Sequence, residues 1–190
     1  MSARADIWNA RHADGALGEP AWVLREHVHL LPASGDALDL ACGLGANALL
    51  LAKAGLRTQA WDSSTVAIRR LREEAGRQSL VMAAEARDVV ALPPDTGSFD
   101  VIVVSHFLER SLFPRLLAAL RPGGLLFYQT FTTERVEGGS SPSSPAFLLA
   151  PNELLGLCSP LRLLVYREDG LAGDLSHGMR ALSTLVGMKA

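Results

Sequence analysis

The stretch Ala37-Leu38-Asp39-Leu40-Ala41-Cys42-Gly43-Leu44-Gly45-Ala46-Asn47-Ala48-Leu49-Leu50-Leu51-Ala52 decides the fold of this chain. Its first five residues form a short apolar run that follows Pro, Ser and Gly, which predicts a buried strand. Gly43 and Gly45 permit backbone conformations, and a close ligand approach, that a Cβ atom would block. After Asn47 the apolar residues recur at helical spacing until Gly55, so a helix follows the glycine turn.

A glycine turn between a strand and a helix is a typical site for a nucleotide-like cofactor. The start of the helix leaves free backbone N–H groups that face any ligand laid over them. In open α/β sheets such ligands bind outside the carboxyl ends of the strands. Residues 43–48 also satisfy the pattern G-x-G-x-x-G/A, and Asp62 follows about 20 residues later. This stretch alone therefore leaves open which adenosine-containing cofactor is bound.

Strands and helices are expected to alternate along most of the chain. Apolar runs predict strands over 37–41, 56–62, 80–85, 99–105 and 125–131, and two closing strands over 161–167 and 180–187. Helices are expected over 20–31, 65–77, 111–120 and 151–157, and a turn over 121–124. The sequence thus predicts an α/β protein with a Rossmann-like, doubly wound sheet of seven strands. The sheet should be mostly parallel, with helices on both faces and an antiparallel closing strand.

Composition excludes several classes of function. The chain has 190 residues, 48% of them hydrophobic and 20% charged, as in a globular domain. Its net charge of −2 gives no electrostatic case for binding nucleic acid or an anionic membrane. No apolar run approaches the roughly 20 residues of a membrane span, and no signal peptide is expected. The 2 cysteines, Cys42 and Cys158, suggest a reducing compartment, so we expect a cytoplasmic protein.

Four motifs follow one another between residues 37 and 131. They are Asp39-x-x-Cys42-Gly43-x-Gly45-x-Asn47, then Trp61-Asp62, then Asp88-Val89 with Leu92-Pro93 and Ser98-Phe99-Asp100-Val101-Ile102, and finally Leu120-Arg121-Pro122-Gly123-Gly124-Leu125-Leu126. In this order they resemble the class I S-adenosylmethionine-dependent methyltransferases. The resemblance implies S-adenosyl-L-methionine as cofactor, S-adenosyl-L-homocysteine as product, and methyl transfer by in-line displacement.

Three further segments resemble a subgroup of small methyltransferases that includes tellurite-resistance methyltransferases and relatives of thiopurine methyltransferase. They are Trp8-x-x-Arg11, Gly43-x-Gly45-x-Asn47-Ala48 and Tyr128-Gln129-Thr130-Phe131. This resemblance implies a small-molecule acceptor, such as a thiol or a chalcogen oxyanion. We expect one methyltransferase domain over 1–190. It would comprise a helical arm or lid over 1–33, the cofactor-binding core over 37–131, and a substrate-side loop and closing strands over 132–190.

The resemblance also implies which residues hold the cofactor. Asp62 would accept hydrogen bonds from the ribose hydroxyls, and Asp39 would lie near the amino group. Asp88 and the Val89 N–H would bind the adenine ring. Other residues expected at the cofactor are Gly43, Gly45, Asn47, Ser63, Ser105, Trp8 and Arg11. Each acid also has a structural interpretation: a helix N-terminal acid for Asp62, an acid binding the N–H groups of the glycine loop for Asp39, and a loop cap for Asp88.

The ends of the fourth and fifth strands are expected to face the methyl group. His106 is the candidate catalytic residue, as a general base or a substrate partner, and a base is needed only if the nucleophile arrives protonated. Phe107, Arg110 and Gln129 are candidate substrate residues, and Arg110 would pair with an anionic substrate. Alternatively, His106 and Phe107 pack in the core and Arg110 lies on the surface. The arm at Trp8 and the loop 138–145 are candidate lids.

Two other functions remain open. A nicotinamide-dependent oxidoreductase is disfavoured because the chain has no Tyr-x-x-x-Lys pair and no second domain. A catalytically degenerate S-adenosylmethionine-binding protein also stays open: loss of Asp62 or of the glycines would have indicated it, and this chain keeps them. No metal site is expected, since His27 and His29 are two residues apart and cannot share a helix face. An N-P-P-Y-type motif, typical of amino methylation, is absent after the fourth strand, where Ser105-His106-Phe107-Leu108 stands.

Overall fold

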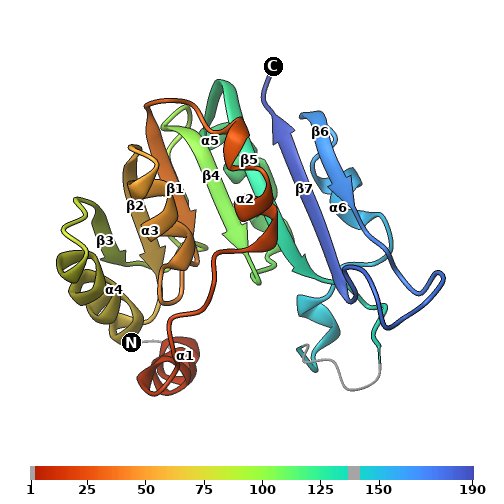
Figure 1. Ribbon diagram of the computed structural model, residues 1–190, viewed down its shortest axis with the longest axis horizontal. Helices are drawn as coiled ribbons and strands as arrows, with labels where there is room; N and C mark the ends of the chain where they lie inside the picture. The colour runs from red at the N-terminus through yellow and green to blue at the C-terminus, as the bar shows by residue number, and fades with distance from the viewer. Residues whose placement is uncertain (1–2, 137–141) are drawn as a thin grey trace.

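The computed structural model describes residues 3–136 and 142–190, so the predicted loop lid over 138–145 lies partly outside the described residues. Seven strands form one sheet in the order β3-β2-β1-β4-β5-β7-β6 (Figure 1). Their bounds are β1 Asp36–Leu40, β2 Arg57–Asp62, β3 Ala83–Ala86, β4 Phe99–Ser105, β5 Leu120–Phe131, β6 Arg162–Arg167 and β7 Leu182–Met188. Six of these strands run in the same direction, and β7 runs antiparallel to both of its neighbours, β5 and β6. The predicted Rossmann-like fold is confirmed.

Helices cover both faces of the sheet because residues alternate sides along each strand. Ala37 of β1 packs in a core with α2 (Trp22–Glu26) and α3 (Ala46–Lys53). Leu38, the next residue, packs on the opposite face in a core with α5 and α6. The remaining helices are α1 Ala3–Ala13, α4 Thr65–Arg77, α5 Phe113–Ala119 and α6 Glu153–Leu157, with short 3-10 turns at Val28–Leu30, Arg110–Leu112 and Pro145–Phe147.

Helix α1 occupies a place of its own in the molecule. Figure 1 shows α1 below the carboxyl ends of the parallel strands, beside the start of α4. It therefore lies over the edge of the sheet where ligands bind in this architecture. Among the described residues, no helix is both long enough and apolar enough to cross a lipid bilayer.

Several predicted boundaries are wrong in detail. The helix predicted over 20–31 ends at Glu26, where His27 leaves the helical conformation (φ −119°, ψ 26°) and a 3-10 turn follows. The strand predicted over 80–85 begins only at Ala83, because it lies at the sheet edge with Val81 almost fully exposed. The turn predicted over 121–124 is part of β5, which pairs with β4 through a register shift near Phe99.

The glycine turn after β1 adopts the left-handed backbone conformation. The φ angle is +53° at Gly43 and +83° at Gly45. A Cβ atom at Gly45 would also overlap the side chain of Leu71, which packs against the turn from α4. Gly45 is thus required by backbone conformation and by packing together.

We expect Gly45→Ala to lower the free energy of unfolding by about 2 kcal/mol or more, because alanine is strained at this φ and would displace Leu71. Urea unfolding of both proteins measures the difference. Gly76→Ala is the control: Gly76 lies in α4 with open space around it, so this change should stabilise the protein by about 0.5–1 kcal/mol. Equal effects of the two substitutions would contradict the packing argument.

Candidate functional site

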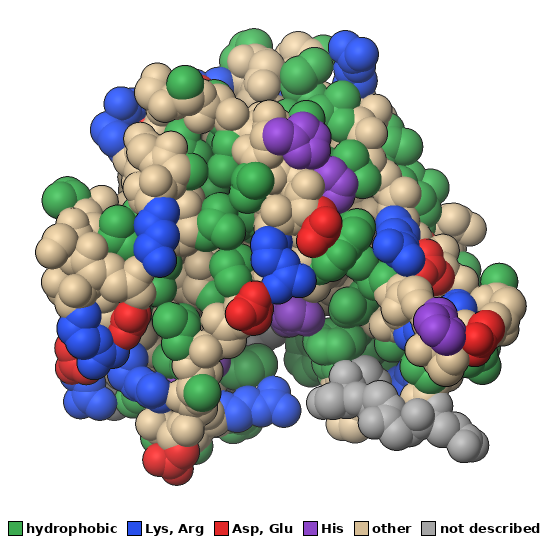
Figure 2. Space-filling view, in the orientation of Figure 1, with side chains coloured by type: hydrophobic (Ala, Val, Ile, Leu, Met, Phe, Trp, Pro, Cys, Tyr) green, Lys and Arg blue, Asp and Glu red, His purple; other side chains and the backbone are tan. Residues whose placement is uncertain are grey.

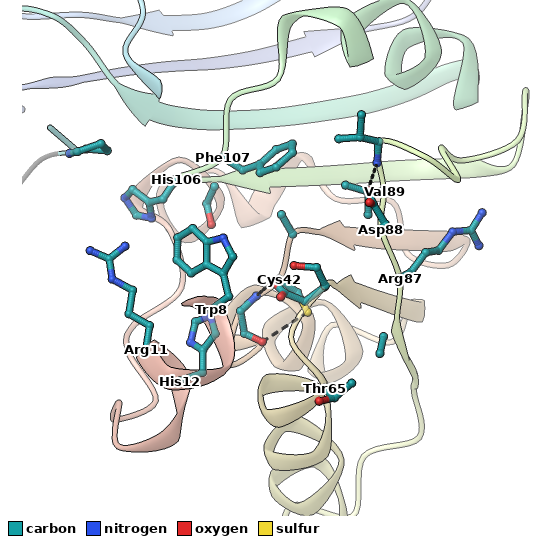
Figure 3. Close-up of a pocket in the computed structure, with 18 of the residues that line it drawn as sticks. Trp8, Arg11, His12, Cys42, Thr65, Arg87, Asp88, Val89, His106 and Phe107 are labelled. Carbon is teal, nitrogen blue, oxygen red and sulfur yellow. Dashed lines mark hydrogen bonds between the residues drawn. The ribbon is translucent and has the colours of Figure 1, made fainter. Parts of the chain in front are cut away.

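A cavity of about 650 Å³ opens at the carboxyl ends of the parallel strands. Figure 2 shows the molecule hollowed along this lower edge. The volume is within the range of small-molecule and cofactor sites. The lining residues come from α1, the glycine turn, the loops after β2 and β3, and the ends of β4 and β5. They are Trp8, Arg11, His12, Ala41, Cys42, Gly43, Asp62, Ser63, Thr65, Ala86, Arg87, Asp88, Val89, Val90, Ser105, His106, Phe107, Phe131 and Pro142 (Figure 3).

Asp62 ends β2 and links the glycine turn to α4. Its Oδ2 accepts a hydrogen bond from the Gly43 N–H at 2.8 Å, and its Oδ1 accepts one from the Ser64 N–H at 2.8 Å. Each carboxylate oxygen can accept a further bond, and Asp62 lines the cavity. Ser64 caps α4, with its Oγ accepting from the Ala67 N–H at 3.1 Å. Asp62 therefore holds the turn and still faces a ligand.

Asp39 does not line the cavity. It is fully buried under the first turn of α3, where its Oδ2 accepts from the Ala48 N–H at 3.0 Å. Its Oδ1 accepts from Asn47 Nδ2 at 3.4 Å. Burial raises the pKa of Asp39 to about 7. These contacts correspond to the structural interpretation of Asp39, an acid that binds N–H groups of the glycine loop.

Asn47 and Gln129 hold the N-terminal segment on the sheet. Asn47 Oδ1 accepts from the Ala21 N–H at 2.8 Å, and Gln129 Oε1 accepts from the Val23 N–H at 3.0 Å. Asn47 Nδ2 also donates to Ser105 Oγ, at 3.0 Å, and Ser105 lines the cavity. Neither Asn47 nor Gln129 lines the cavity, so their predicted ligand contacts are replaced by buried contacts within the protein. Gly45 does not line it either.

Asp88 and Val89 line the end of the cavity after β3. Asp88 Oδ1 accepts from the N–H groups of Val90 at 3.0 Å and Ala91 at 3.2 Å, which caps the loop. Arg87 is a lining residue that the sequence did not indicate. Its guanidinium lies 4.0 Å from the ring centre of Trp61, which fixes this wall.

Helix α1 is held against the start of α4 at two points. Asn9 Oδ1 accepts from Ser64 Oγ at 2.8 Å and from the Val66 N–H at 3.2 Å. Arg70 Nη1 donates to the His12 carbonyl at 2.6 Å, at the last turn of α1. This docking places one face of the helix in the cavity wall.

That face of α1 carries Trp8, Arg11 and His12 (Figure 3). Trp8 and His12 stack with ring centres 5.7 Å apart, and Arg11 Cζ lies 5.2 Å from the Trp8 ring centre. Burial lowers the pKa of His12. His12 was not predicted as a site residue, although its spacing of four from Trp8 puts both on one helix face.

His106, Phe107 and Phe131 line the cavity at the ends of β4 and β5. His106 has a φ of +54°, a strained conformation for a residue with a Cβ, and its N–H donates to the Gln129 carbonyl at 2.8 Å. Its ring centre lies 5.0 Å from that of Phe131. Desolvation of the imidazole by the surrounding residues lowers the pKa of His106, so the ring is neutral at pH 7.

Arg110 does not line the cavity. Its Nε donates to Glu153 Oε1 at 2.5 Å, and its Nη2 donates to Glu153 Oε2 at 2.8 Å and to the Leu148 carbonyl at 2.9 Å. These bonds fasten the loop before α6 to the loop after β4. The predicted pairing of Arg110 with an anionic substrate therefore finds no support, because its guanidinium is occupied by Glu153.

Cys42 lines the cavity as a thiol, since burial raises its pKa well above the ordinary value. Cys158 is buried elsewhere, and burial raises its pKa to about 12. Neither cysteine is therefore a nucleophile at neutral pH. Within residues 3–136 and 142–190, no cluster of His, Cys, Asp and Glu side chains is arranged to hold a metal ion.

The family model described as a methyltransferase domain matches residues 37–124, from β1 into β5. This is the segment that builds the glycine turn, Asp62 and the Asp88 loop. This segment of the chain is therefore similar to a methyltransferase domain. The solved structure of TehB from Haemophilus influenzae is similar over 98% of this chain and 67% of its own, with a TM-score of 0.70 and 22% identity.

Curated relatives match this chain over part of their own length. The ubiquinone biosynthesis O-methyltransferase of Methylocella silvestris is 35% identical over 160 residues, which are 74% of this chain and 62% of that protein. A protein of Eikenella corrodens named Hemagglutinin 1 is 33% identical over 127 residues, 64% of this chain and 41% of that protein. The chain thus spans less than two thirds of the length of these relatives.

We expect the free energy of unfolding to depend on Asp39 between about pH 4 and about pH 7. The unfolded carboxyl ionises near pH 3.9, whereas the folded one keeps its proton to about pH 7. The folded state binds more protons in this interval, so stability falls as pH rises and levels off above it. The decline should be on the order of 4 kcal/mol, because the two pKa values differ by about 3 and each pH unit corresponds to about 1.4 kcal/mol. Urea unfolding across this pH range measures it.

Asp39→Asn should remove this part of the pH dependence because the amide does not titrate. Asp95→Asn is the matched control, since Asp95 is exposed and outside the cavity. An unchanged pH slope in Asp39→Asn would contradict the raised pKa.

Proposed function

We propose that the chain is an S-adenosylmethionine-dependent methyltransferase that acts on a small-molecule acceptor. The observation that carries the proposal is one continuous cavity with two chemically different ends. Asp62, Asp88 and Val89 lie at one end, with the groups needed for a ribose diol and an adenine ring. His106 and Phe131 lie at the other, at the ends of β4 and β5, and the ring of Phe107 points from the end of β4 toward Val89 (Figure 3).

The residues present fit the cofactor. Asp62 keeps acceptor capacity toward the cavity while its backbone bonds fix its orientation. A Cβ atom at Gly43 would point at the His12 ring, 3.4 Å from Cε1, so the glycine keeps this part of the cradle open. Asp88 has an oxygen left for an exocyclic amine, and the neighbouring Val89 supplies a backbone N–H and carbonyl.

The bound cofactor supplies a methyl group that is already activated by its sulfonium. The protein therefore has to align the acceptor and keep water away from it. Trp8, Phe107 and Phe131 provide apolar walls for that purpose. His106 is neutral at pH 7 and can take up a proton from an acceptor that arrives protonated.

A thiol or chalcogen oxyanion is the acceptor class favoured by the resemblance to tellurite-resistance and thiopurine methyltransferases. The match of almost the whole chain to the TehB fold is compatible with that subgroup. A catalytically degenerate protein that only binds the cofactor is the second candidate. An NAD-dependent oxidoreductase is the third, because the glycine turn alone also suits a dinucleotide.

Calorimetric titration with S-adenosylhomocysteine and, separately, with NAD tests the cofactor assignment. We expect Asp62→Asn to weaken S-adenosylhomocysteine binding about 10- to 100-fold, because the amide accepts hydrogen bonds at one atom only. Asp95→Asn, with the same charge change outside the cavity, should bind like the wild type. Binding of NAD alone would overturn the proposal, and binding of neither ligand would contradict it.

Release of S-adenosylhomocysteine during incubation with thiols, selenite and tellurite tests the acceptor. We expect turnover with at least one of them. His106→Asn should slow turnover of acceptors that are protonated at the assay pH about 100-fold, and leave turnover of deprotonated acceptors nearly unchanged. Equal losses for both kinds would assign His106 to binding rather than to proton transfer. Cofactor binding without turnover of any acceptor would favour the degenerate protein.

A further inference from the structure

We infer that the acceptor end of the cavity binds a planar oxyanion, such as a carboxylate, and that Arg11 is the residue that recognises it. The inference rests on the proposed function, because it takes the end beside His106 as the place of the acceptor. Arg11 takes the role that the sequence predicted for Arg110, because the Arg110 guanidinium is bound to Glu153.

Arg11 is a cation in the cavity wall whose guanidinium has no hydrogen-bond partner among the described residues. It lies on α1, is exposed, and its Cζ is 5.2 Å from the Trp8 ring centre. In Figure 3 its guanidinium extends from α1 toward the His106 side of the cavity. In the described part of the chain no carboxylate pairs with Arg11, whereas Arg87 pairs with Glu85.

The charges of the cavity are divided between its two ends. Both lining carboxylates, Asp62 at the end of β2 and Asp88 in the loop after β3, lie at the end assigned to the cofactor. Arg87, the other lining arginine, follows β3 at the same end and pairs with Glu85. The two lining histidines, His12 and His106, have lowered pKa values and are neutral at pH 7. Arg11 is therefore the charged side chain that the described residues place at the acceptor end.

The neighbouring side chains make this charge selective. Trp8 lies under the Arg11 guanidinium, 5.2 Å from Cζ to the ring centre, and covers one face of it. A guanidinium offers two parallel N–H groups, which match the two oxygens of a carboxylate. A cationic acceptor would be repelled at the same place, and flat aromatic walls suit a flat acceptor body. The arrangement favours an unsaturated or aromatic anion over an amine.

Three probes of nearly equal shape test the inference: benzoate, benzamide and benzamidine, with charges of −1, 0 and +1. Each is titrated by calorimetry into protein saturated with S-adenosylhomocysteine. We expect benzoate to bind about tenfold tighter than benzamide, as for a hydrogen bond to a charged group, and benzamidine to bind weakest. The preference for benzoate should also decline with added salt.

Arg11→Gln should remove the preference for benzoate and leave the affinity for benzamide unchanged, with each titration in protein saturated with S-adenosylhomocysteine. Much weaker binding of S-adenosylhomocysteine itself by Arg11→Gln would assign Arg11 to the cofactor, as the resemblance implies, and would overturn the inference. Arg11→Lys should retain part of it, because lysine keeps the charge and loses the fork of donors. Arg115→Gln is the control, since it removes an exposed arginine that does not line the cavity. The inference is overturned if benzoate does not bind, if benzamide binds as well as benzoate, or if Arg11→Gln leaves the preference intact.

The experiment separates this inference from the proposed function. Failure of S-adenosylhomocysteine to bind in the first titration contradicts the cofactor assignment and, with it, the inference. Normal S-adenosylhomocysteine binding with no selectivity for benzoate overturns the role of Arg11 alone. Helix content by circular dichroism shows whether each variant is folded.

Discussion

The carboxylate of Asp62 is the contact on which the cofactor end of the structure depends. It binds the N–H of Gly43 in the turn after β1 and the N–H of Ser64 at the start of α4. Ser64 in turn binds Asn9 of α1 through its hydroxyl. The glycine turn, the ligand-facing acid and the helix that covers the cavity are thus one hydrogen-bonded unit. A change at any of these points is transmitted to the other two.

A second group of buried polar side chains sets the position of the acceptor end. Asn47 binds Asp39, Ser105 and the backbone at Ala21, so it joins β1, β4 and the segment before α2. Buried amides and carboxylates are costly unless they are paired, and these partners supply the pairing. These buried contacts explain why Asp39 and Asn47, which the motif suggests as ligand contacts, bind other residues of the protein instead.

The distribution of arginine partners gives the cavity its electrostatic character. Arg110 and Arg87 have carboxylate partners that fasten loops around the site. Arg121 pairs with Asp36 and Asp100, residues of β1 and β4. Arg11 alone among these four is directed to the cavity without such a partner in the described residues. The same residue type therefore has a structural role at three positions and a proposed binding role at one.

The sequence by itself determined the sheet and the glycine turn, because these depend on local patterns. A few neighbouring residues are enough to interpret the apolar run at 99–105, the glycines and Asp62. The tertiary structure alone decided the rest. Asn47 meets Ala21 across 26 residues, Gln129 meets Val23 across 106, and Arg110 meets Glu153 across 43. Such partners are chosen by packing, so local patterns could not separate Arg11 from Arg110 or reveal His12.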